Sequence, residues 1–489
     1  MHAKSETVNT NSFKYEYVFL VFVTIIAAGL RFYKLGEWSL WGDEILTMLR
    51  ARSVFQNILS DPSVVYYVLA EAEITHILTY IPLKLFGMTE WDARLAPALI
   101  GIFSIPILYF PIKKIFNPSV GLIAVSLLAV ATWHIEWSQN ARFYVLLLLF
   151  YSLALIAFYK GIEEDNPWYL VLSVFFLYLA TRERLFSMFF VPITFGYLFL
   201  LMILPVNKPR GLRLRNFLIV FIPAGIIALY FGGFFVVEEG EWEETFVIVT
   251  QNSFSELLVL YIEAIGIPLL CMGLLGGIYM LFTERFRIAL LLGINAAVPL
   301  SAILVLSQIQ FVAIRYTFIS LITLVIFAGF AVVELISQTP KSAKLLALGC
   351  VAILFISPLK ENFMYYQYEN GARANWKAAF ELVEQNQRPD DLILTNTHTL
   401  GMYYLKNNQH VIDMMDIDLE FLKKSQHRIW FVHNRRRVNP DIVIWIDQNA
   451  RLVGVFDVHQ DEQNHEMRVY LYDPGEPQKF ASPIFSNIP

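Results

Sequence analysis

The sequence predicts a polytopic α-helical membrane protein with about eleven spans, followed by a small C-terminal α/β domain outside the membrane. Three observations lead to this fold class. Of the 489 residues, 56% are hydrophobic and only 16% are charged, against about 25% charged in typical soluble domains. Residues 359–489 carry 32 charges in 131 positions, whereas residues 1–358 carry 47 in 358. Apolar runs of roughly 20 residues, the length that crosses a bilayer, recur throughout residues 1–358.

The composition also excludes several classes of protein. The 15% aromatic content and the lack of a short repeat exclude disorder, collagen and coiled coil. The net charge of −5 argues against nucleic-acid binding. Cys271 and Cys350 both lie inside apolar runs, so they predict neither a disulfide framework nor a clustered metal site.

The membrane domain, residues 1–358, is predicted from the spacing of its apolar runs. The first run follows a polar stretch and has no small-residue cleavage site, so we expect a retained span and no cleaved signal peptide. One further apolar segment, residues 74–87, is only 14 residues long and is short for a crossing. The predicted spans are 17–33, 93–112, 119–134, 143–160, 167–181, 185–204, 217–237, 256–281, 286–306, 314–337 and 343–358.

The orientation follows from the cationic loops. Lys and Arg gather after the second, sixth, eighth and tenth spans, which places these loops on one side, with a cytoplasmic N-terminus. This parity requires that residues 74–87 do not cross, so we predict an amphipathic helix on the outer surface, within a first outer loop of residues 34–92. The acidic run 238–244 then lies outside, and 163–165 lies in an inner loop. An odd span count places residues 359–489 on the outer face of the plasma membrane.

The outer domain is predicted from alternating helix and strand patterns. Helices are expected at 376–387 and 441–450, with a turn at 388–391. Because the region has no Gly-rich phosphate loop and no nucleophile elbow, we expect a structural or acceptor-positioning role. Strands are expected at 392–396, 410–414, 428–432, 452–457 and 467–472.

An adjacent pair of carboxylates, Asp43 and Glu44, is the first candidate for chemistry. The pair lies just after the first predicted span and is flanked by Trp38 and Trp41. A carboxylate near low-dielectric material is a better proton acceptor than one in water, which favours a general base. An acidic pair that faces headgroup water is the alternative interpretation.

Arginines at the outer ends of spans are the second candidate. Cations there run against the positive-inside trend, and guanidinium groups suit a lipid-linked phosphate because they form bidentate hydrogen bonds. Scattered headgroup anchors are the alternative. His134 and Glu136 offer only two metal ligands, which do not make a site. The four arginines are Arg142, Arg182, Arg184 and Arg315.

Several short motifs occur in a fixed order along the chain. By their order, spacing and side of the membrane they resemble the GT-C superfamily of integral-membrane glycosyltransferases, within the group that includes protein O-mannosyltransferases and lipid A aminoarabinose transferases. The motifs are Arg31-Phe-Tyr-Lys-Leu-Gly36, Gly42-Asp-Glu44, Leu85-Phe-Gly87, Glu90-Trp-Asp-Ala-Arg-Leu95, Lys113-Lys-Ile-Phe116, Ser138-Gln-Asn-Ala-Arg-Phe-Tyr144, Arg315-Tyr316 and, at the start of the tail, Asn375-Trp-Lys377.

The resemblance implies transfer of a sugar from a polyprenyl-phosphate donor to a lipid, glycan or protein acceptor on the outer face. Asp43 matches the family's catalytic aspartate and Glu44 its neighbour, and the reaction is expected to invert the anomeric centre. Arg142, Arg182, Arg184 and Arg315 are the candidate phosphate ligands, with His76, Tyr144 and Tyr316 lining the substrate cavity. A monophosphate donor demands no metal cofactor, whereas a pyrophosphate donor makes a divalent cation possible.

One departure from the family pattern concerns the start of the predicted surface helix. Relatives often carry His or Lys followed by Pro-Pro there, and this chain has Glu71-Ala-Glu-Ile74. The sequence therefore removes a cation and two helix-starting prolines. Three other functions stay open at this point: a lipid or sugar transporter or flippase, a non-catalytic scaffold, and a polymerase or ligase of lipid-linked glycans.

Overall fold

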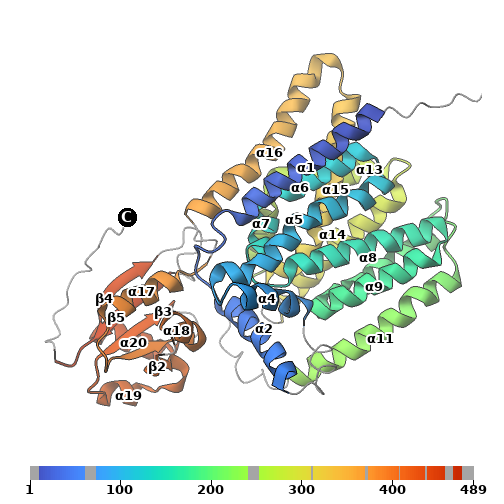
Figure 1. Cartoon of the computed structure of the whole chain (residues 1–489). Coiled ribbons are helices and arrows are strands. Elements are labelled where there is room, and N and C mark those ends of the chain that lie inside the picture. Colours follow the sequence, from blue (N-terminus) through green and yellow to red (C-terminus); the bar gives the residue numbers. More distant parts are fainter. Residues whose placement is uncertain are drawn as a thin grey trace, which may run out of the picture. The chain divides into compact units, whose positions relative to one another are not determined.

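A computed structural model gives the fold, and it describes residues 10–60, 73–239, 253–309, 312–368, 373–406, 408–434, 438–456 and 466–475. The chain forms two compact units (Figure 1). The helical unit comprises Met1–Tyr33, Asn57–Thr79 and Arg94–Asn362. The sheet unit comprises Lys34–Gln56, Tyr80–Ala93 and Phe363–Pro489. Two parts of the predicted first outer loop therefore group with the C-terminal residues.

The helical content matches the predicted polytopic membrane domain. In the described part of the chain, eight helices are long and apolar enough to cross a membrane, or up to ten if each of two bent pairs is one span. Each of these ten corresponds to a predicted span. The eleventh, 167–181, is helix α9, whose 17 residues are at the lower end of the range that crosses a bilayer. The elements are α1 (Thr10–Phe32), α2 (Gly42–Ser60), α4 (Ile74–Leu85), α5 (Glu90–Ile115), α6 (Pro118–Val130), α7 (Thr132–Ser138), α8 (Tyr144–Glu164), α9 (Pro167–Glu183), η2 (Leu185–Phe189), α10 (Phe190–Ile203), α11 (Leu214–Glu239), α12 (Phe254–Ile265), α13 (Ile267–Leu281), α14 (Phe286–Leu306), η3 (Ile314–Ser320), α15 (Leu321–Gln338), η4 (Lys341–Ala343) and α16 (Lys344–Gln367).

Two predicted spans are bent rather than straight. Helices α6 and α7 meet at 62°, and α12 and α13 meet at 90°. The second bend falls at Gly266, whose positive φ of 83° suits glycine, and Pro268 follows in the first turn of α13. At the first bend the guanidinium of Arg31 donates hydrogen bonds to the carbonyls of Leu128 and Ala129, which the helix itself leaves unbonded.

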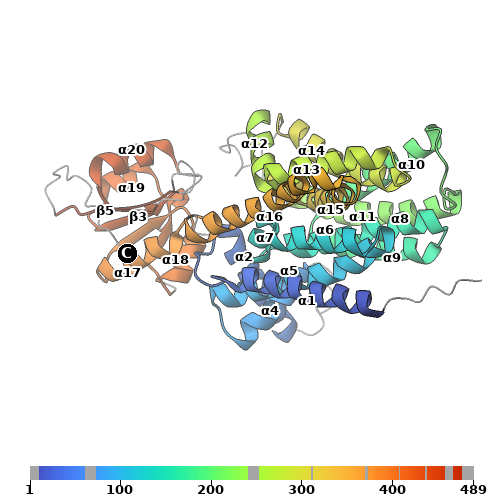
Figure 2. The same cartoon turned by 90° about the horizontal axis from the view of Figure 1, so that it is seen from above.

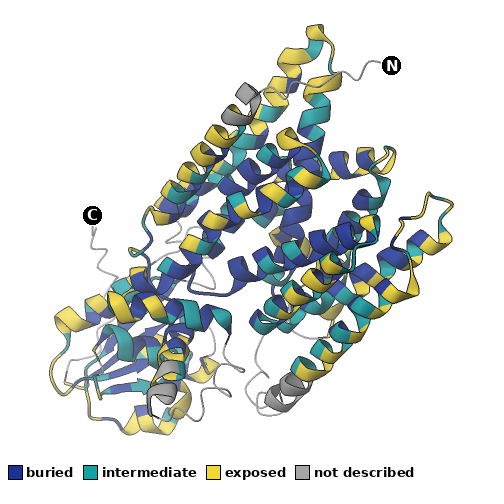
Figure 3. Cartoon of the chain, turned by 45° about the vertical axis from the view of Figure 1, so that its right-hand side comes forward, coloured by how far each residue is buried: buried dark blue, intermediate teal, exposed yellow. Residues whose placement is uncertain are grey.

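Burial divides the helices of the helical unit into central and peripheral ones. The apolar segment of α8 is 83% buried and that of η3 with α15 is 78% buried, whereas the segments of α11 and α16 are 17% and 11% buried. Figure 3 shows the buried residues on the inner faces of the bundle and the exposed ones on its outermost helices. Exposed apolar side chains such as Leu345 and Leu346 are expected where lipid is the solvent.

Charged loops meet at one end of the helical unit. Arg287 pairs with Glu163 at 2.6 Å, and Arg213 and Arg215 each pair with Asp165 at 2.8 Å. The acidic run 163–165, which is unexpected in a predicted inner loop, therefore neutralises arginines of two neighbouring loops. Helix α8 runs from this end to Tyr144, and its 21 residues span roughly 30 Å.

Helix α4, with 12 residues, is too short to cross the membrane, in agreement with the sequence interpretation.

The C-terminal part of the sheet unit is a small α/β domain, as predicted. Its five-stranded sheet has the order β2-β1-β3-β5-β4, in which β1 is parallel to β2 and β3 and the remaining pairs are antiparallel. Helices lie on both faces of the sheet (Figure 2). The elements are α17 (Trp376–Asn386), β1 (Leu392–Thr395), α18 (His398–Tyr404), β2 (Val411–Asp413), η5 (Met414–Asp416), α19 (Leu419–Lys424), β3 (Ile429–His433), α20 (Pro440–Asn449), β4 (Arg451–Phe456) and β5 (Met467–Tyr472).

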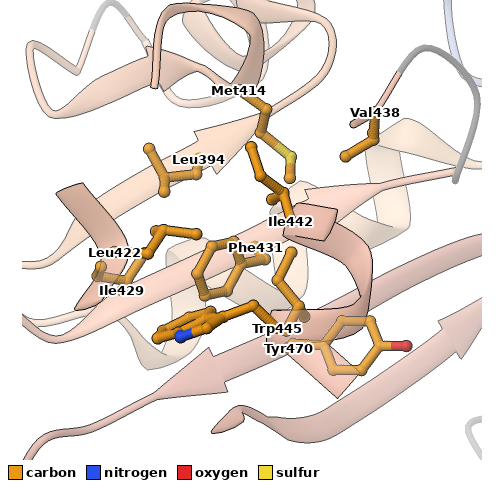
Figure 4. Close-up of a cluster of buried hydrophobic side chains, with 10 residues drawn as sticks. Leu394, Met414, Leu422, Ile429, Phe431, Val438, Ile442, Trp445 and Tyr470 are labelled. Carbon is orange, nitrogen blue, oxygen red and sulfur yellow. The ribbon is translucent and has the colours of Figure 1, made fainter. Parts of the chain in front are cut away.

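This domain has a core of buried hydrophobic side chains. Trp445 of α20 packs on Phe431 of β3 and Tyr472 of β5, and Leu422 of α19 joins the same cluster (Figure 4). Alternate residues of the strands, such as Ile429 and Phe431 of β3, point to this core. Both predicted helices and all five predicted strands are present. The short helices α18 and α19 are additions to the sequence-based prediction.

Candidate functional site

The carboxylates of Asp43 and Glu44 lie in the first turn of α2, within the sheet unit. Acidic residues are favoured there because the amide groups of a helix N-terminus carry partial positive charge. The two side chains differ in exposure, since Glu44 is fully buried and Asp43 is half-buried. Asp43 is therefore the member of the pair that solvent or a substrate can reach.

The buried carboxylate of Glu44 has a cationic partner that the sequence analysis missed. Its Oε2 lies 3.7 Å from Nε of Arg373, which is also buried. The Arg373 guanidinium in turn lies 5.5 Å from the centre of the Trp38 ring. Because an isolated charge is costly to bury, this pair assigns Glu44 a structural role beside Asp43. Roles for both carboxylates in catalysis stay a prediction.

Two of the predicted arginines share one aromatic ring in the helical unit. The guanidinium carbon of Arg142 lies 4.9 Å from the centre of the Phe143 ring, and that of Arg184 lies 4.6 Å from it. Phe143 follows Arg142 directly before α8, whereas Arg184 follows α9, so the packing of α8 on α9 brings the two together. The quadrupole of one ring therefore attracts two cations at this end of the unit.

A chain of aromatic contacts links this pair to the third arginine. The Phe186 ring lies 6.4 Å from Phe143, 6.4 Å from Tyr144 and 5.5 Å from Tyr316, between ring centres. The Arg315 guanidinium lies 5.8 Å from the centre of the Tyr316 ring. The structure therefore gathers Arg142, Arg184, Arg315, Tyr144 and Tyr316 into one network, which we call the arginine–aromatic cluster. Arg182 is half-buried in the last turn of α9, two residues before Arg184.

His76 joins the cluster through a carboxylate. One oxygen of Glu73 lies 3.1 Å from Nη1 of Arg184, and the other lies 3.5 Å from Nε2 of His76. The next carboxylate, Glu183, accepts a 2.6 Å hydrogen bond from the Thr75 hydroxyl and a 3.3 Å bond from its backbone amide. Glu183 thus caps the start of α4 from another helix, which replaces the helix-starting prolines that this chain lacks. Glu71 lies outside the described residues.

Trp137 is a further site residue that the sequence analysis missed. Its ring is buried and lies 4.0 Å from the Tyr144 ring, between centres. Its indole N–H has no hydrogen-bond partner among the residues that the structure describes. A buried donor left unbonded costs about 1–3 kcal/mol, so such a group suits a ligand. In the sequence, Trp137 is indistinguishable from a core aromatic residue.

The metal candidates have other partners. The Nδ1 atom of the fully buried His134 lies 2.7 Å from Nη2 of Arg31, so it accepts a hydrogen bond from that guanidinium. Across the described ranges, no group of three or more His, Cys, Asp or Glu residues is placed to hold a metal ion. Of the acidic run 238–244, residues 240–244 lie outside the described part of the chain.

Known proteins with the same architecture can now be compared. The family profile of dolichyl-phosphate-mannose-protein mannosyltransferases matches residues 74–231. ArnT from Cupriavidus metallidurans, bound to undecaprenyl phosphate, superposes with a TM-score of 0.58 at 16% identity, covering 94% of this chain and 99% of that one. The apo oligosaccharyltransferase of Archaeoglobus fulgidus has a TM-score of 0.58 at 12% identity, covering 85% and 69%. AglB from the same organism, in complex with an inhibitory peptide and a dolichol-phosphate, has a TM-score of 0.58 at 12% identity, covering 86% of this chain and 69% of that one. No curated protein matches this chain by sequence.

These comparisons confirm the predicted fold class. The chain is a multi-span membrane protein with the GT-C architecture and a small mixed sheet near the C-terminus. The profile match over α4 to α11 also confirms the resemblance to membrane glycosyltransferases that the motifs indicate. At 12–16% identity the solved structures establish the fold, and the chemistry of this chain has to be argued from its own residues.

Proposed function

We propose that this protein is a membrane glycosyltransferase that moves a sugar from a polyprenyl-phosphate donor to an acceptor on the outer face of the plasma membrane. The arginine–aromatic cluster carries the proposal, because it holds three guanidinium groups at one end of the helical unit. The matched family and the lipid phosphates bound to ArnT and AglB support a donor of this class.

The donor chemistry follows from the charge of the leaving group. When a sugar leaves a polyprenyl phosphate, negative charge grows on the phosphate oxygens, and fixed cations stabilise it. Arg142 and Arg315 supply such cations, with Arg184 shared between the phosphate and Glu73. The indole N–H of Trp137 adds a neutral donor beside Tyr144. A monophosphate leaving group needs no metal ion in this scheme.

The acceptor chemistry needs a base, and Asp43 is the proposed one. It takes the proton of the acceptor hydroxyl as the oxygen attacks the anomeric carbon, while the bond from that carbon to the phosphate oxygen breaks. A single displacement inverts the anomeric centre, in contrast to the two-step path of retaining enzymes. Glu44, paired with Arg373, holds the first turn of α2 in place.

The proposal includes an orientation. Lys and Arg in the loops that follow the second, sixth, eighth and tenth predicted spans favour the cytoplasmic side, and the sheet unit then lies outside. The donor sugar and the class of acceptor are left open by the residues. Both would follow from mass analysis of cell-envelope glycans after deletion of the gene.

The decisive test replaces Asp43 by Asn in membranes that carry a polyprenyl-phosphate sugar with a labelled hexose or pentose. We expect transfer to fall by a factor of about 100 or more, because general base catalysis contributes roughly 10² to 10⁴. Glu37→Gln is the matched control, since Glu37 lies in the same loop and is exposed, 3.6 Å from Lys34.

Two outcomes would contradict the proposal. Near-native transfer by the Asn variant would show that Asp43 is not the base. Movement of the labelled lipid across the membrane without any transfer of its sugar would favour a flippase instead.

A further inference from the structure

A set of polar contacts within the sheet unit joins the loop before Asp43 to the C-terminal α/β domain. The loop segments are Lys34–Gln56 and Tyr80–Ala93, and they form one compact unit with residues from Phe363 on. Hydrogen bonds, two ion pairs and ring contacts cross this junction in the described residues. It therefore has the character of a built interface.

Tyr404, at the end of α18, lies at the centre of this junction. Its phenol oxygen accepts a 2.8 Å hydrogen bond from the backbone amide of Leu40 and donates a 3.3 Å bond to Oε1 of Glu90. Leu40 is three residues before Asp43, and Glu90 begins α5. One hydroxyl group therefore ties the approach to the proposed base to the second loop segment. Its ring is held by Phe380 of α17, at 6.1 Å between centres.

Neighbouring contacts fix the same two segments. The Ser39 hydroxyl accepts a 3.2 Å hydrogen bond from the backbone amide of Lys377, and the Lys377 ammonium lies 3.4 Å from Oε1 of Glu90. The Tyr403 hydroxyl donates a 2.8 Å bond to the carbonyl of Met88. Donors from α17 and α18 thus hold residues before α2 and before α5.

The loop transmits this support to Asp43 over a short path. The Trp41 carbonyl accepts hydrogen bonds from the amides of Glu44 and Ile45, which closes the first turn of α2 directly after Leu40. The side chain of Glu44 is anchored on Arg373 in the same unit. Between two fixed points, at Leu40 and Glu44, the backbone of Asp43 has little freedom.

We propose that the C-terminal α/β domain positions the base for catalysis, and that Tyr404 is the positioning residue through which it does so. This inference rests on the proposed function, since it takes Asp43 to be the base. The physical reason is that a base displaced by about 1 Å from its substrate loses roughly 10²-fold in rate, so its loop needs external support. A freely appended binding module would need no such bonds to residues 39, 40, 88 and 90.

The test compares Tyr404→Phe with Tyr470→Phe. Both variants keep the ring and remove one hydroxyl, but the Tyr470 hydroxyl donates a 2.8 Å bond to Asp447 inside the α/β domain. For Tyr404→Phe we expect kcat to fall about tenfold with an unchanged KM for the donor. For Tyr470→Phe we expect unchanged kcat, at a similar shift in melting temperature.

Hydrogen exchange supplies a readout that does not depend on activity. In the full-length protein in detergent, the peptide that contains Leu40 should exchange faster in Tyr404→Phe than in Tyr470→Phe. A second comparison adds Glu90→Gln, and the loss of turnover in the double variant with Tyr404→Phe should be smaller than the two single losses combined, because the two residues share one hydrogen bond.

Each result bears on a different statement. Equal turnover in Tyr404→Phe and Tyr470→Phe, or equal exchange of the Leu40 peptide in both, would overturn the positioning role. Retained transfer in Asp43→Asn would overturn the assignment of the base, whatever Tyr404→Phe does. Loss of kcat together with faster exchange in Tyr404→Phe alone is the result that supports the inference.

Discussion

In the helical unit the guanidinium groups of Arg142 and Arg184 lie on the ring of Phe143, whereas in the sheet unit the carboxylate of Glu44 lies against the guanidinium of Arg373. An aromatic ring attracts a cation through its quadrupole and carries no net opposite charge of its own; Arg184 also pairs with Glu73. A carboxylate carries a full negative charge, which offsets the positive charge of the guanidinium beside it. The first arrangement therefore suits an anionic ligand, and the second suits a rigid support for the neighbouring Asp43.

The largest expected effect comes from breaking the buried ion pair between Arg373 and Glu44. Arg373→Ala removes the cation that lies 3.7 Å from the buried Glu44 carboxylate, and removing one partner of a buried pair costs about 3–5 kcal/mol. The melting temperature of the solubilised protein measures this loss. Lys424→Ala is the control, because Lys424 and Glu420 form an exposed pair at 2.7 Å whose removal changes stability little. Equal melting of the two variants would show that the Glu44 pair is not a structural support.

The second effect tests Arg142, one of the two arginines on the ring of Phe143. Arg142→Ala should weaken binding of undecaprenyl phosphate about ten- to hundredfold, since hydrogen bonds to charged groups contribute roughly 1.5–3 kcal/mol. Binding of undecaprenol, which lacks the phosphate, should not change. Arg213→Ala removes an arginine that pairs with Asp165 at the other end of the helical unit, and its affinity should match that of the unaltered protein. Unchanged phosphate affinity in Arg142→Ala would remove the phosphate assignment.

The smallest effect concerns a neutral donor. Trp137→Phe removes the buried indole N–H and should reduce the affinity for undecaprenyl phosphate about fivefold, the equivalent of roughly 1 kcal/mol. Trp133→Phe, in the same helix and packed on Phe318, makes the same change of ring at an indole N–H that is not among the buried unbonded atoms of the described residues. A loss of affinity in Trp137→Phe alone is expected. Equal affinities in the two variants would show that Trp137 is only a packing residue.

The sequence predicts the long elements well because their signal is local. Runs of about 20 apolar residues, and short apolar runs between turn residues, can be recognised without knowing which other parts of the chain they contact. Bends and caps depend on partners from elsewhere in the chain. Arg31 bonds the carbonyls at the end of α6, and Glu183 caps α4, and neither role has a signature near the helix that it serves.

The candidate site divides in the same way. Asp43, Arg142, Arg184 and Arg315 are predictable because charges are scarce in the membrane domain, and three of them meet in the arginine–aromatic cluster. Arg373 and Tyr404 are not predictable, since their importance comes from contacts with residues more than 300 positions earlier. A buried cation or a phenol in a domain of ordinary composition carries no comparable local signal.

The ring of Phe143 contacts the guanidinium groups of two arginines that come from different parts of the chain. Because both Arg142 and Arg184 are seated on this one ring, a change at Phe143 withdraws support from two charges at once. Phe143 itself bears no charge and donates no hydrogen bond from its side chain, yet its ring contacts two of the proposed phosphate ligands.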